Sequence, residues 1–275
     1  GHKMLNLLKL TFSLQDHESL VHPRMMLGAN AEILFLTMAI SAVITWIFKP
    51  EQLTDNPIRR MVGYSNPCVF WDSPPALWVA FILFTPTVYF SIRYAALDSM
   101  RAKSDPELGR LKYRIILVLN FWYAFSQCLT MGIFVVRPDD GTLTSMRLHG
   151  LCFIQLVMPL CMCISGNYLE SMWKGDPLSK TQTMVLATYI LVSILETVFA
   201  GSAVLLYKND GVHVHNMYVM QAIDYAWFAS LGPASIMMPH GKPLLIRVSE
   251  VSTVEVGFEG EELPHDEGKL KGQIE

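Results

Sequence analysis

Long apolar runs alternate with short polar segments along the whole chain. Six of these runs are about 20 residues long, and charged residues, Pro or Gly bound each of them. At about 1.5 Å of rise per residue, each run is long enough to cross a hydrocarbon core of about 30 Å as an α-helix. The runs are continuous rather than alternating, which argues against membrane-spanning strands. The predicted spans are residues 25–48, 76–96, 115–136, 148–168, 184–207 and 217–238.

The composition points to the same class of protein. Hydrophobic residues make up 52% of the 275 residues and charged residues only 16%, whereas soluble domains average about 25% charged. The net charge of −3 provides no strongly basic surface, so nucleic acid is not an expected partner. We therefore predict an all-α, polytopic membrane protein whose six transmembrane helices form a bundle.

The basic residues predict an orientation for this bundle. Fifteen of the 21 Lys and Arg residues fall in the N-terminal segment, in the loops after the second and fourth spans, and in the C-terminal tail. Cytoplasmic segments carry an excess of Lys and Arg, so both termini are predicted to be cytoplasmic. Residues 1–24 form a possibly amphipathic segment that either lies along the membrane or packs on the bundle. Residues 239–275 form a polar, acidic tail, and we expect its last part, residues 257–275, to be extended or disordered.

Residues 49–75 form the longest loop on the non-cytoplasmic side. This loop is rich in Pro and turn-forming residues. Its apolar residues include Val69, Phe70 and Trp71, and Trp is favoured at the boundary between membrane and water. We therefore expect these side chains to lie at that interface.

Acidic residues inside the spans are the main candidates for a functional site, because burying a charge in the membrane is expensive. Glu32 lies about two turns into the first span, within reach of basic residues at the cytoplasmic side, and we expect it to form an ion pair. The candidate partners are Arg24, Arg93 and Arg114. Glu196 lies near the middle of the fifth span, where no basic residue is predicted. It is therefore either protonated or lines a polar cavity.

Asp224 is the third intramembrane acid and lies about 10 Å below the non-cytoplasmic end of the sixth span. Arg147 and His149 open the fourth span at that same side, so we predict that Asp224 pairs with one of them and joins two helices. Gln221 lies three residues before Asp224 and shares its face, which predicts a hydrogen bond between helices. A neighbouring stripe of small residues predicts close helix packing: Ala222, Ala226 and Ser230.

Recognisable catalytic chemistry is missing from the sequence. We find no Walker loop, G-x-S-x-G elbow, H-E-x-x-H helix or GxGxxG turn. Four of the five cysteines lie in apolar runs, where they are expected to pack as core residues. The sequence therefore predicts no catalytic residues, no cofactor and no metal site.

Several short motifs, taken in order, resemble one known family. The second span ends in "FSIRYAAL", the fourth opens with "RLHGLCFIQ", and the sixth contains "AIDYAWF", followed by "LLIRVSEV". The loop 49–75 contains "LTDNP". With the six-span layout, these motifs resemble the DRAM (damage-regulated autophagy modulator)-type superfamily. Its relatives include GPI-anchor lipid-remodelling proteins and phosphoinositide-linked plasma-membrane proteins. The pair Asp224–Tyr225 stands where the resemblance leads us to expect Glu–Trp.

This resemblance implies a function linked to membrane lipids, marks His149 and Asp224 as matching positions, and carries no catalytic machinery with it. We expect a non-catalytic accessory or scaffold protein that handles or organises lipid. Its partners would be membrane lipids and other membrane proteins, in the endoplasmic reticulum, another endomembrane or the plasma membrane. Three alternatives stay open: a transporter or channel that uses Glu196 and Asp224, a lipid-modifying enzyme, and a supernumerary subunit of a large membrane complex.

Overall fold

Helices dominate the part of the chain that the computed structural model describes, which is residues 18–138, 142–206, 208, 214–239, 241, 243–248 and 254–258. The long helices are α2 (Pro23–Phe48), α4 (Ala76–Ser104), α5 (Arg110–Thr130), α6 (Leu143–Trp173), α7 (Lys180–Leu206) and α8 (Met217–Ile236). The short ones are α3 (Pro57–Val62) and the 3-10 helices η1 (Pro50–Leu53), η2 (Pro67–Phe70) and η3 (Met131–Phe134). The strands are β1 (Glu18–Val21), β2 (Leu244–Val248) and β3 (Val254–Phe258).

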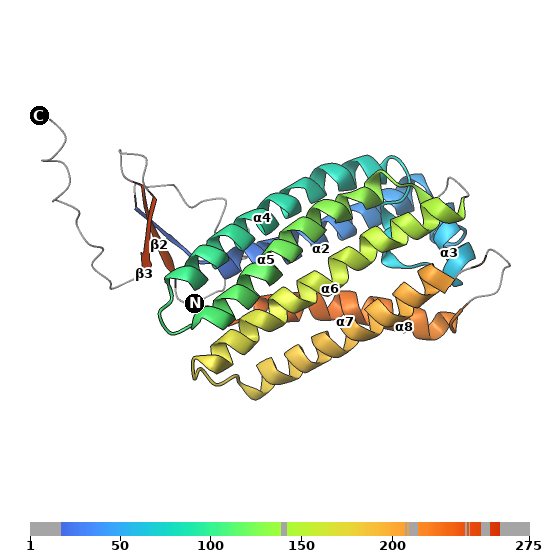
Figure 1. Cartoon of the computed structure of the whole chain (residues 1–275). Coiled ribbons are helices and arrows are strands. Elements are labelled where there is room, and N and C mark those ends of the chain that lie inside the picture. The colour runs from blue at the N-terminus through green and yellow to red at the C-terminus, as the bar shows by residue number, and fades with distance from the viewer. Residues whose placement is uncertain are drawn as a thin grey trace, which may run out of the picture.

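The six long helices pack in chain order into a closed ring. Each long helix contacts the next one along the chain, and α8 returns to contact α2. Figure 1 shows the helices running side by side, with the strands beyond one end of the bundle and α3 at the other. We call these the sheet end and the loop end. Helices that follow one another along the chain thus pack as antiparallel neighbours, as in up-and-down helix bundles.

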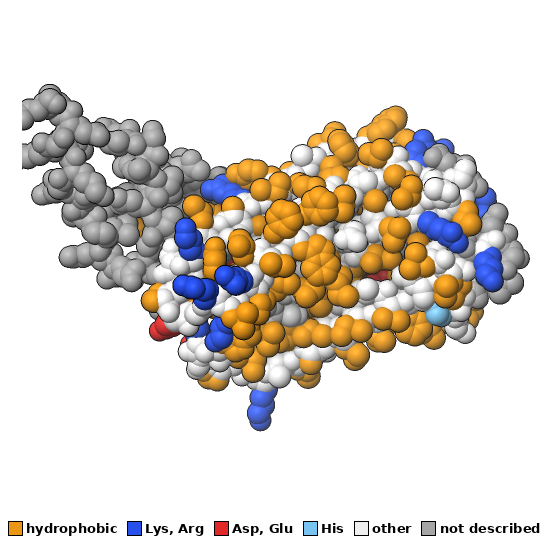
Figure 2. Space-filling model, viewed as in Figure 1, with side chains coloured by type: hydrophobic (Ala, Val, Ile, Leu, Met, Phe, Trp, Pro, Cys, Tyr) orange, Lys and Arg blue, Asp and Glu red, His pale blue; other side chains and the backbone are white. Residues whose placement is uncertain are grey.

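Within the described residues, five helices are long and apolar enough to cross a membrane, which indicates an integral membrane protein. They are Pro23–Phe48, Ala76–Ser104, Arg110–Phe134, Leu143–Trp173 and Lys180–Leu206. Large apolar side chains such as Ile82 and Phe121 are exposed on these helices. Figure 2 shows that apolar side chains cover much of the visible face of the bundle, with Lys and Arg gathered towards its two ends. The helix α8 is not among the five, since Gln221 and Asp224 lower its mean hydropathy.

Helix boundaries follow local capping chemistry. The Asn216 side chain accepts hydrogen bonds from two backbone N–H groups at the start of α8, and Thr142 caps α6 in the same way. Two helices extend beyond the predicted spans: α4 continues to Ser104 and α6 continues to Trp173. The added turns carry charged side chains that are buried against one another, so these charges do not end the helices.

The described part of the chain is helical apart from one small antiparallel sheet, which agrees with the predicted all-α class. The strand order of this sheet is β1–β2–β3, with Glu18 opposite Arg247 and Leu244 opposite Phe258. The sheet pairs the beginning of the tail with the segment just before α2, a contact that the sequence did not predict. The strands are short, and they are held by backbone hydrogen bonds between segments far apart in the sequence. Such pairing cannot be recognised from a local pattern of apolar residues. The amphipathic part of the N-terminal segment and the last part of the tail lie outside the described residues.

The loop 49–75 folds back onto the bundle, which corrects the interfacial placement of Val69 and Trp71. Both side chains are only 2% exposed. The Trp71 ring makes an edge contact with Phe134 at a centroid distance of 5.7 Å, and the Thr45 hydroxyl donates a 2.7 Å hydrogen bond to the Phe70 carbonyl. The loop therefore closes the loop end of the ring.

Candidate functional site: two buried polar clusters

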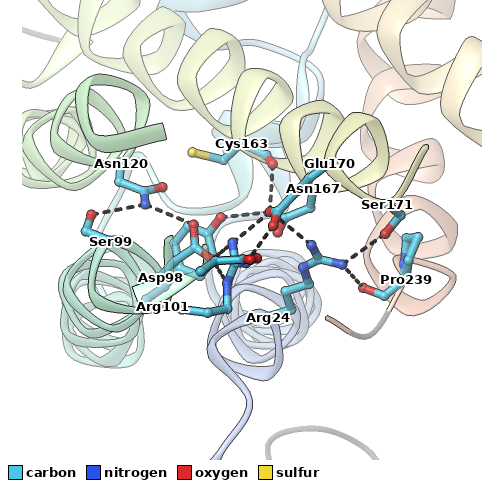
Figure 3. A network of polar contacts seen from close by, with 12 residues as sticks. Arg24, Asp98, Ser99, Arg101, Asn120, Cys163, Asn167, Glu170, Ser171 and Pro239 are labelled. Atoms are coloured by element: carbon cyan, nitrogen blue, oxygen red, sulfur yellow. Dashed lines mark hydrogen bonds and ion pairs between the residues drawn. The ribbon is translucent and has the colours of Figure 1, made fainter. Parts of the chain in front are cut away.

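The first cluster lies at the sheet end and is centred on Glu170 of α6. The Arg101 guanidinium donates to both Glu170 carboxylate oxygens, at 2.6 and 2.7 Å. Arg24, at the start of α2, donates to the same carboxylate at 3.2 Å. Figure 3 shows the two guanidinium groups converging on this carboxylate from different helices. Paired hydrogen bonds from an Arg to a carboxylate are among the stronger and more directional contacts in proteins.

Further partners complete this cluster, which we call the arginine cluster. Asp98 accepts hydrogen bonds from Arg101 at 2.9 Å and from Asn120 of α5 at 3.0 Å. Lys174 forms ion pairs with Asp105 and, at 3.2 Å, with Glu170. Three basic side chains thus meet three acidic ones: Arg24, Arg101 and Lys174 with Asp98, Asp105 and Glu170. Because the charges balance, burial does not leave an uncompensated ion.

The arginine cluster also holds the C-terminal tail in place. Arg24 donates a 2.6 Å hydrogen bond to the Pro239 carbonyl, just after α8. A Cβ on Gly241 would lie 3.0 Å from the Arg24 guanidinium carbon, so the tail passes close to this side chain. Arg24, one of three candidate partners of Glu32, is thus engaged by Glu170, and the ion pair of Glu32 stays a prediction. The Glu32 side chain is half-buried on α2.

The second cluster lies near the loop end, where Glu196 of α7 meets Asp224 of α8. Each is only 1% exposed, and the two carboxyl groups lie close enough for the charge on one to act on the other. Two buried carboxyl groups at close range do not both ionise, because like charges repel each other in a desolvated site, so the pair retains one proton. We call these two residues the carboxyl pair. The sequence predicted that Glu196 would be protonated or line a cavity, but did not place it beside Asp224.

Tyr64, from the loop 49–75, is the third member of this site. Its hydroxyl donates a 2.8 Å hydrogen bond to Asp224 Oδ2. Burial raises the pKa of Tyr64 far above its ordinary value, and the nearby Asp224 and Glu196 charges raise it further. The phenol therefore keeps its proton and acts as a fixed donor. Sequence reasoning missed Tyr64, because nothing in a polar loop marks the one side chain that turns inward.

His149 does not pair with Asp224, which overturns that part of the predicted contact. Its Nδ1 lies 2.8 Å from the Val136 carbonyl oxygen, so Nδ1 carries a proton and donates it. Its Nε2 faces the Asp72 carboxylate at 3.6 Å. The imidazole thus joins α6 to the loop 49–75, and Arg147, two residues earlier, is half-buried.

Gln221 and the small-residue stripe of α8 lie outside the packed face. Gln221, Ala222 and Ala226 are exposed, and Ser230 is half-buried. The residues that α8 buries toward its neighbours are spaced by four, three and four positions: Met220, Asp224, Trp227 and Leu231. A residue three positions from Asp224 is displaced by about 60° around the helix, which is enough to place Gln221 beyond the contact. The predicted interhelical role of Gln221 and the close packing of the stripe are therefore wrong within this chain.

A cavity of about 40 Å³ adjoins the carboxyl pair. Its walls come from α6, α7, α8 and the loop 49–75, and they are mainly apolar. The polar side chains among the lining residues are Tyr64, Asn66, His149 and Glu196. Figure 2 shows acidic side-chain surface deep in the seam between α6 and α7, inside an otherwise apolar face.

The chemistry available at the two clusters differs. The arginine cluster is a set of satisfied ion pairs, whereas the carboxyl pair can hold or release a proton and attract a cation. Among the described residues, no group of three or more His, Cys, Asp or Glu side chains is placed to hold a metal ion. Comparisons with protein-family models, with curated proteins and with solved structures gave no match to this chain.

Proposed function

We propose that this chain is a non-catalytic, six-span membrane protein that handles or organises lipid as an accessory or scaffold subunit, together with protein partners. The observation that carries the proposal is the cavity beside Glu196, whose apolar walls belong to helices with lipid-facing surfaces. Cavities with apolar walls and a few convergent polar groups are typical of small-molecule sites. A lipid headgroup with its adjoining chain has this combination of properties.

The packed interior supports an accessory role over a channel. Between the carboxyl pair and the arginine cluster, large side chains that are almost fully buried fill the ring: Tyr123, Leu156, Ile164, Tyr168 and Tyr189. A conduction path along the ring axis would have to displace these side chains. A filled interior fits a protein that binds lipid and protein partners on the outside of its helix bundle.

The orientation in this proposal rests on the basic residues, with α8 as the sixth span. All helix ends at the sheet end then face the cytoplasm, as the excess of Lys and Arg there favours. A protease site inserted after residue 275 tests this arrangement. We expect cleavage from the cytoplasmic side of sealed vesicles, and cleavage only from the opposite side would contradict it.

A proton-coupled carrier is the second candidate, and the proton shared between Glu196 and Asp224 favours it. Intramembrane carboxyl groups serve as proton relays in many transporters. The two candidates differ in a direct measurement, which is proton or solute flux into proteoliposomes that contain the purified protein. Flux that is lost in Asp224→Asn would favour the carrier and overturn the accessory role.

The main test is purification from the native membrane with its surrounding lipid, followed by mass spectrometry of the bound lipids and proteins. We expect a reproducible lipid set that differs from the bulk membrane, together with defined membrane-protein partners. Recovery of one large respiratory or photosynthetic assembly would favour the supernumerary-subunit alternative, and turnover of lipid by the purified protein would favour an enzyme. A lipid set identical to the bulk membrane would contradict lipid handling.

A further inference from the structure

The cavity beside the carboxyl pair has a recognisable ligand chemistry. Its polar side is formed by Glu196, which is almost fully buried and is backed by Asp224. Glu196 Oε2 and Asp224 Oδ1 accept no hydrogen bond from a protein donor among the described residues. The proton that the two acids share provides one hydrogen bond, whereas each carboxylate has about four lone-pair sites. Hydrogen-bond acceptors are therefore in excess at the cavity floor.

The charge at this floor selects a cation. One shared proton leaves one net negative charge on the carboxyl pair, and Tyr64 donates to it without adding charge. His149, on another wall, is already directed to the Val136 carbonyl and to Asp72. A phosphate or carboxylate ligand would face the acids at close range, whereas a group with one positive charge and several N–H donors would satisfy them.

The volume selects the type of cation. A water-sized sphere requires about 10–15 Å³, so the 40 Å³ cavity has room for about three non-hydrogen atoms. The two carbons and the nitrogen of an ethylammonium group fit this space. A trimethylammonium group carries three methyl groups around its nitrogen and has no N–H donors, so it is both too wide and unable to hydrogen-bond.

Access runs along the seam between α6 and α7. The cavity walls on this side include Gly150, Ile154 and Ala200, which are half-buried. A Cβ on Gly150 would lie 2.5 Å from a Val204 methyl group, so the absence of a side chain there lets the two helices approach above the cavity. These walls are apolar and belong to two candidate membrane spans, which places the entrance towards lipid.

We propose that this cavity binds the primary ammonium group of a membrane aminolipid, of the phosphatidylethanolamine type, with Glu196 as the acceptor in the cavity wall and Asp224 behind it. This assignment rests on the proposed lipid-handling function and names the lipid class. The lipid's phosphate and chains stay outside the cavity, along the seam between α6 and α7. The ligand is bound without any covalent step.

The test uses the full chain in nanodiscs that contain equal amounts of phosphatidylethanolamine and phosphatidylcholine, with bound lipid measured by native mass spectrometry. Wild-type protein is expected to retain the ethanolamine lipid about tenfold over the choline lipid, as loss of charge-assisted hydrogen bonds predicts. The N-monomethyl lipid should still bind, and each further methyl group should weaken retention. Free ethylamine at millimolar concentration should displace little of the lipid; full displacement would identify a soluble amine as the ligand and overturn the lipid assignment.

Two variants and two matched controls locate the binding. Glu196→Gln should abolish the preference because a neutral amide replaces the carboxyl group that lines the cavity and confines the negative charge to Asp224 behind it. Ala200→Leu should abolish the preference by filling the cavity. Glu32→Gln removes an acid elsewhere in the membrane region, and Ala222→Leu enlarges an exposed residue of α8; both should keep the preference. The headgroup series on wild-type protein needs no variant, so a folding defect in a variant leaves the proposal testable.

Two negative results have separate meanings. Retention of specific lipids without a preference for the primary ammonium, or an unchanged preference in Glu196→Gln, would overturn the ammonium assignment and leave lipid handling intact. Failure to retain any lipid above the bulk composition in every nanodisc would overturn the proposed function as well.

Discussion

The two ends of the bundle bury similar polar groups in opposite ways. At the sheet end, both carboxylate oxygens of Glu170 accept hydrogen bonds from arginines, and basic and acidic side chains balance. Near the loop end, Glu196 and Asp224 lie close together, the Tyr64 hydroxyl donates to Asp224, and a cavity lies alongside. Burial alone therefore does not define a functional acid. An acid whose neighbours satisfy it holds the fold together, whereas an acid left with spare acceptors beside a cavity is available to a ligand.

The strongest test of this comparison is Glu170→Gln. It leaves Arg24 and Arg101 buried without their shared carboxylate, so we expect a loss of about 3–5 kcal/mol in the free energy of unfolding. Thermal unfolding of the purified protein in detergent measures it. The control is Asp55→Asn, which breaks the fully exposed pair with Arg60 and should leave the unfolding temperature unchanged. Equal unfolding temperatures in the two variants would show that the arginine cluster does not stabilise the bundle.

Tyr64→Phe probes the hydrogen bond that fixes the carboxyl pair to the loop 49–75. Removing the hydroxyl leaves Asp224 Oδ2 buried without its donor, so we expect a loss of about 1–3 kcal/mol. Combined with Asp224→Ala, the loss should be smaller than the sum of the two single losses, because both variants remove the same contact. Additive losses in that cycle would mean that the two side chains do not interact.

Glu196→Gln sharpens the comparison by making the same change as at Glu170 in the other environment. The amide can donate to Asp224 without a shared proton, and repulsion between the acids disappears. We therefore expect a change in unfolding free energy below about 1 kcal/mol, of either sign. A loss as large as that of Glu170→Gln would place Glu196 among the structural ion pairs and remove the contrast between the two ends.

The smallest expected effect concerns the thiol of Cys68, a buried residue of the loop 49–75. Burial raises the pKa of Cys68 well above its usual value, and Asp72 raises it further. Because only the thiolate reacts readily, N-ethylmaleimide at neutral pH should modify Cys68 at least about tenfold more slowly in the folded protein than after denaturation. Mass spectrometry of the labelled peptide measures this rate, with the exposed Cys128 of α5 as the reference. Similar rates for both cysteines would indicate that the loop end is open.

Hydropathy along the chain determined the helices and the membrane class. Apolar runs of about 20 residues can satisfy their backbone groups in a membrane only as helices. The sequence predicted six such runs, and five helices of the described residues are long and apolar enough to span a membrane. The sequence also marked Glu196 and Asp224 as unusual, because an acid within an apolar run is visible without a structure. The spacings Asp98–Arg101 and Glu170–Lys174, three and four residues apart on helices, could have signalled the arginine cluster, but they lie beyond the expected span ends.

Only the tertiary structure decided which polar groups meet. Asp224 pairs with Glu196 and Tyr64 rather than with His149, because the ring order of the helices and the inward fold of the loop 49–75 set their neighbours. Strand β1 precedes the helices in the sequence and β2 follows them, so the two strands pair across more than 200 residues. The local periodicity of apolar residues shows which face of a segment is apolar. A contact between distant segments depends instead on how the whole chain packs. For this reason the site could not be assembled from the sequence alone.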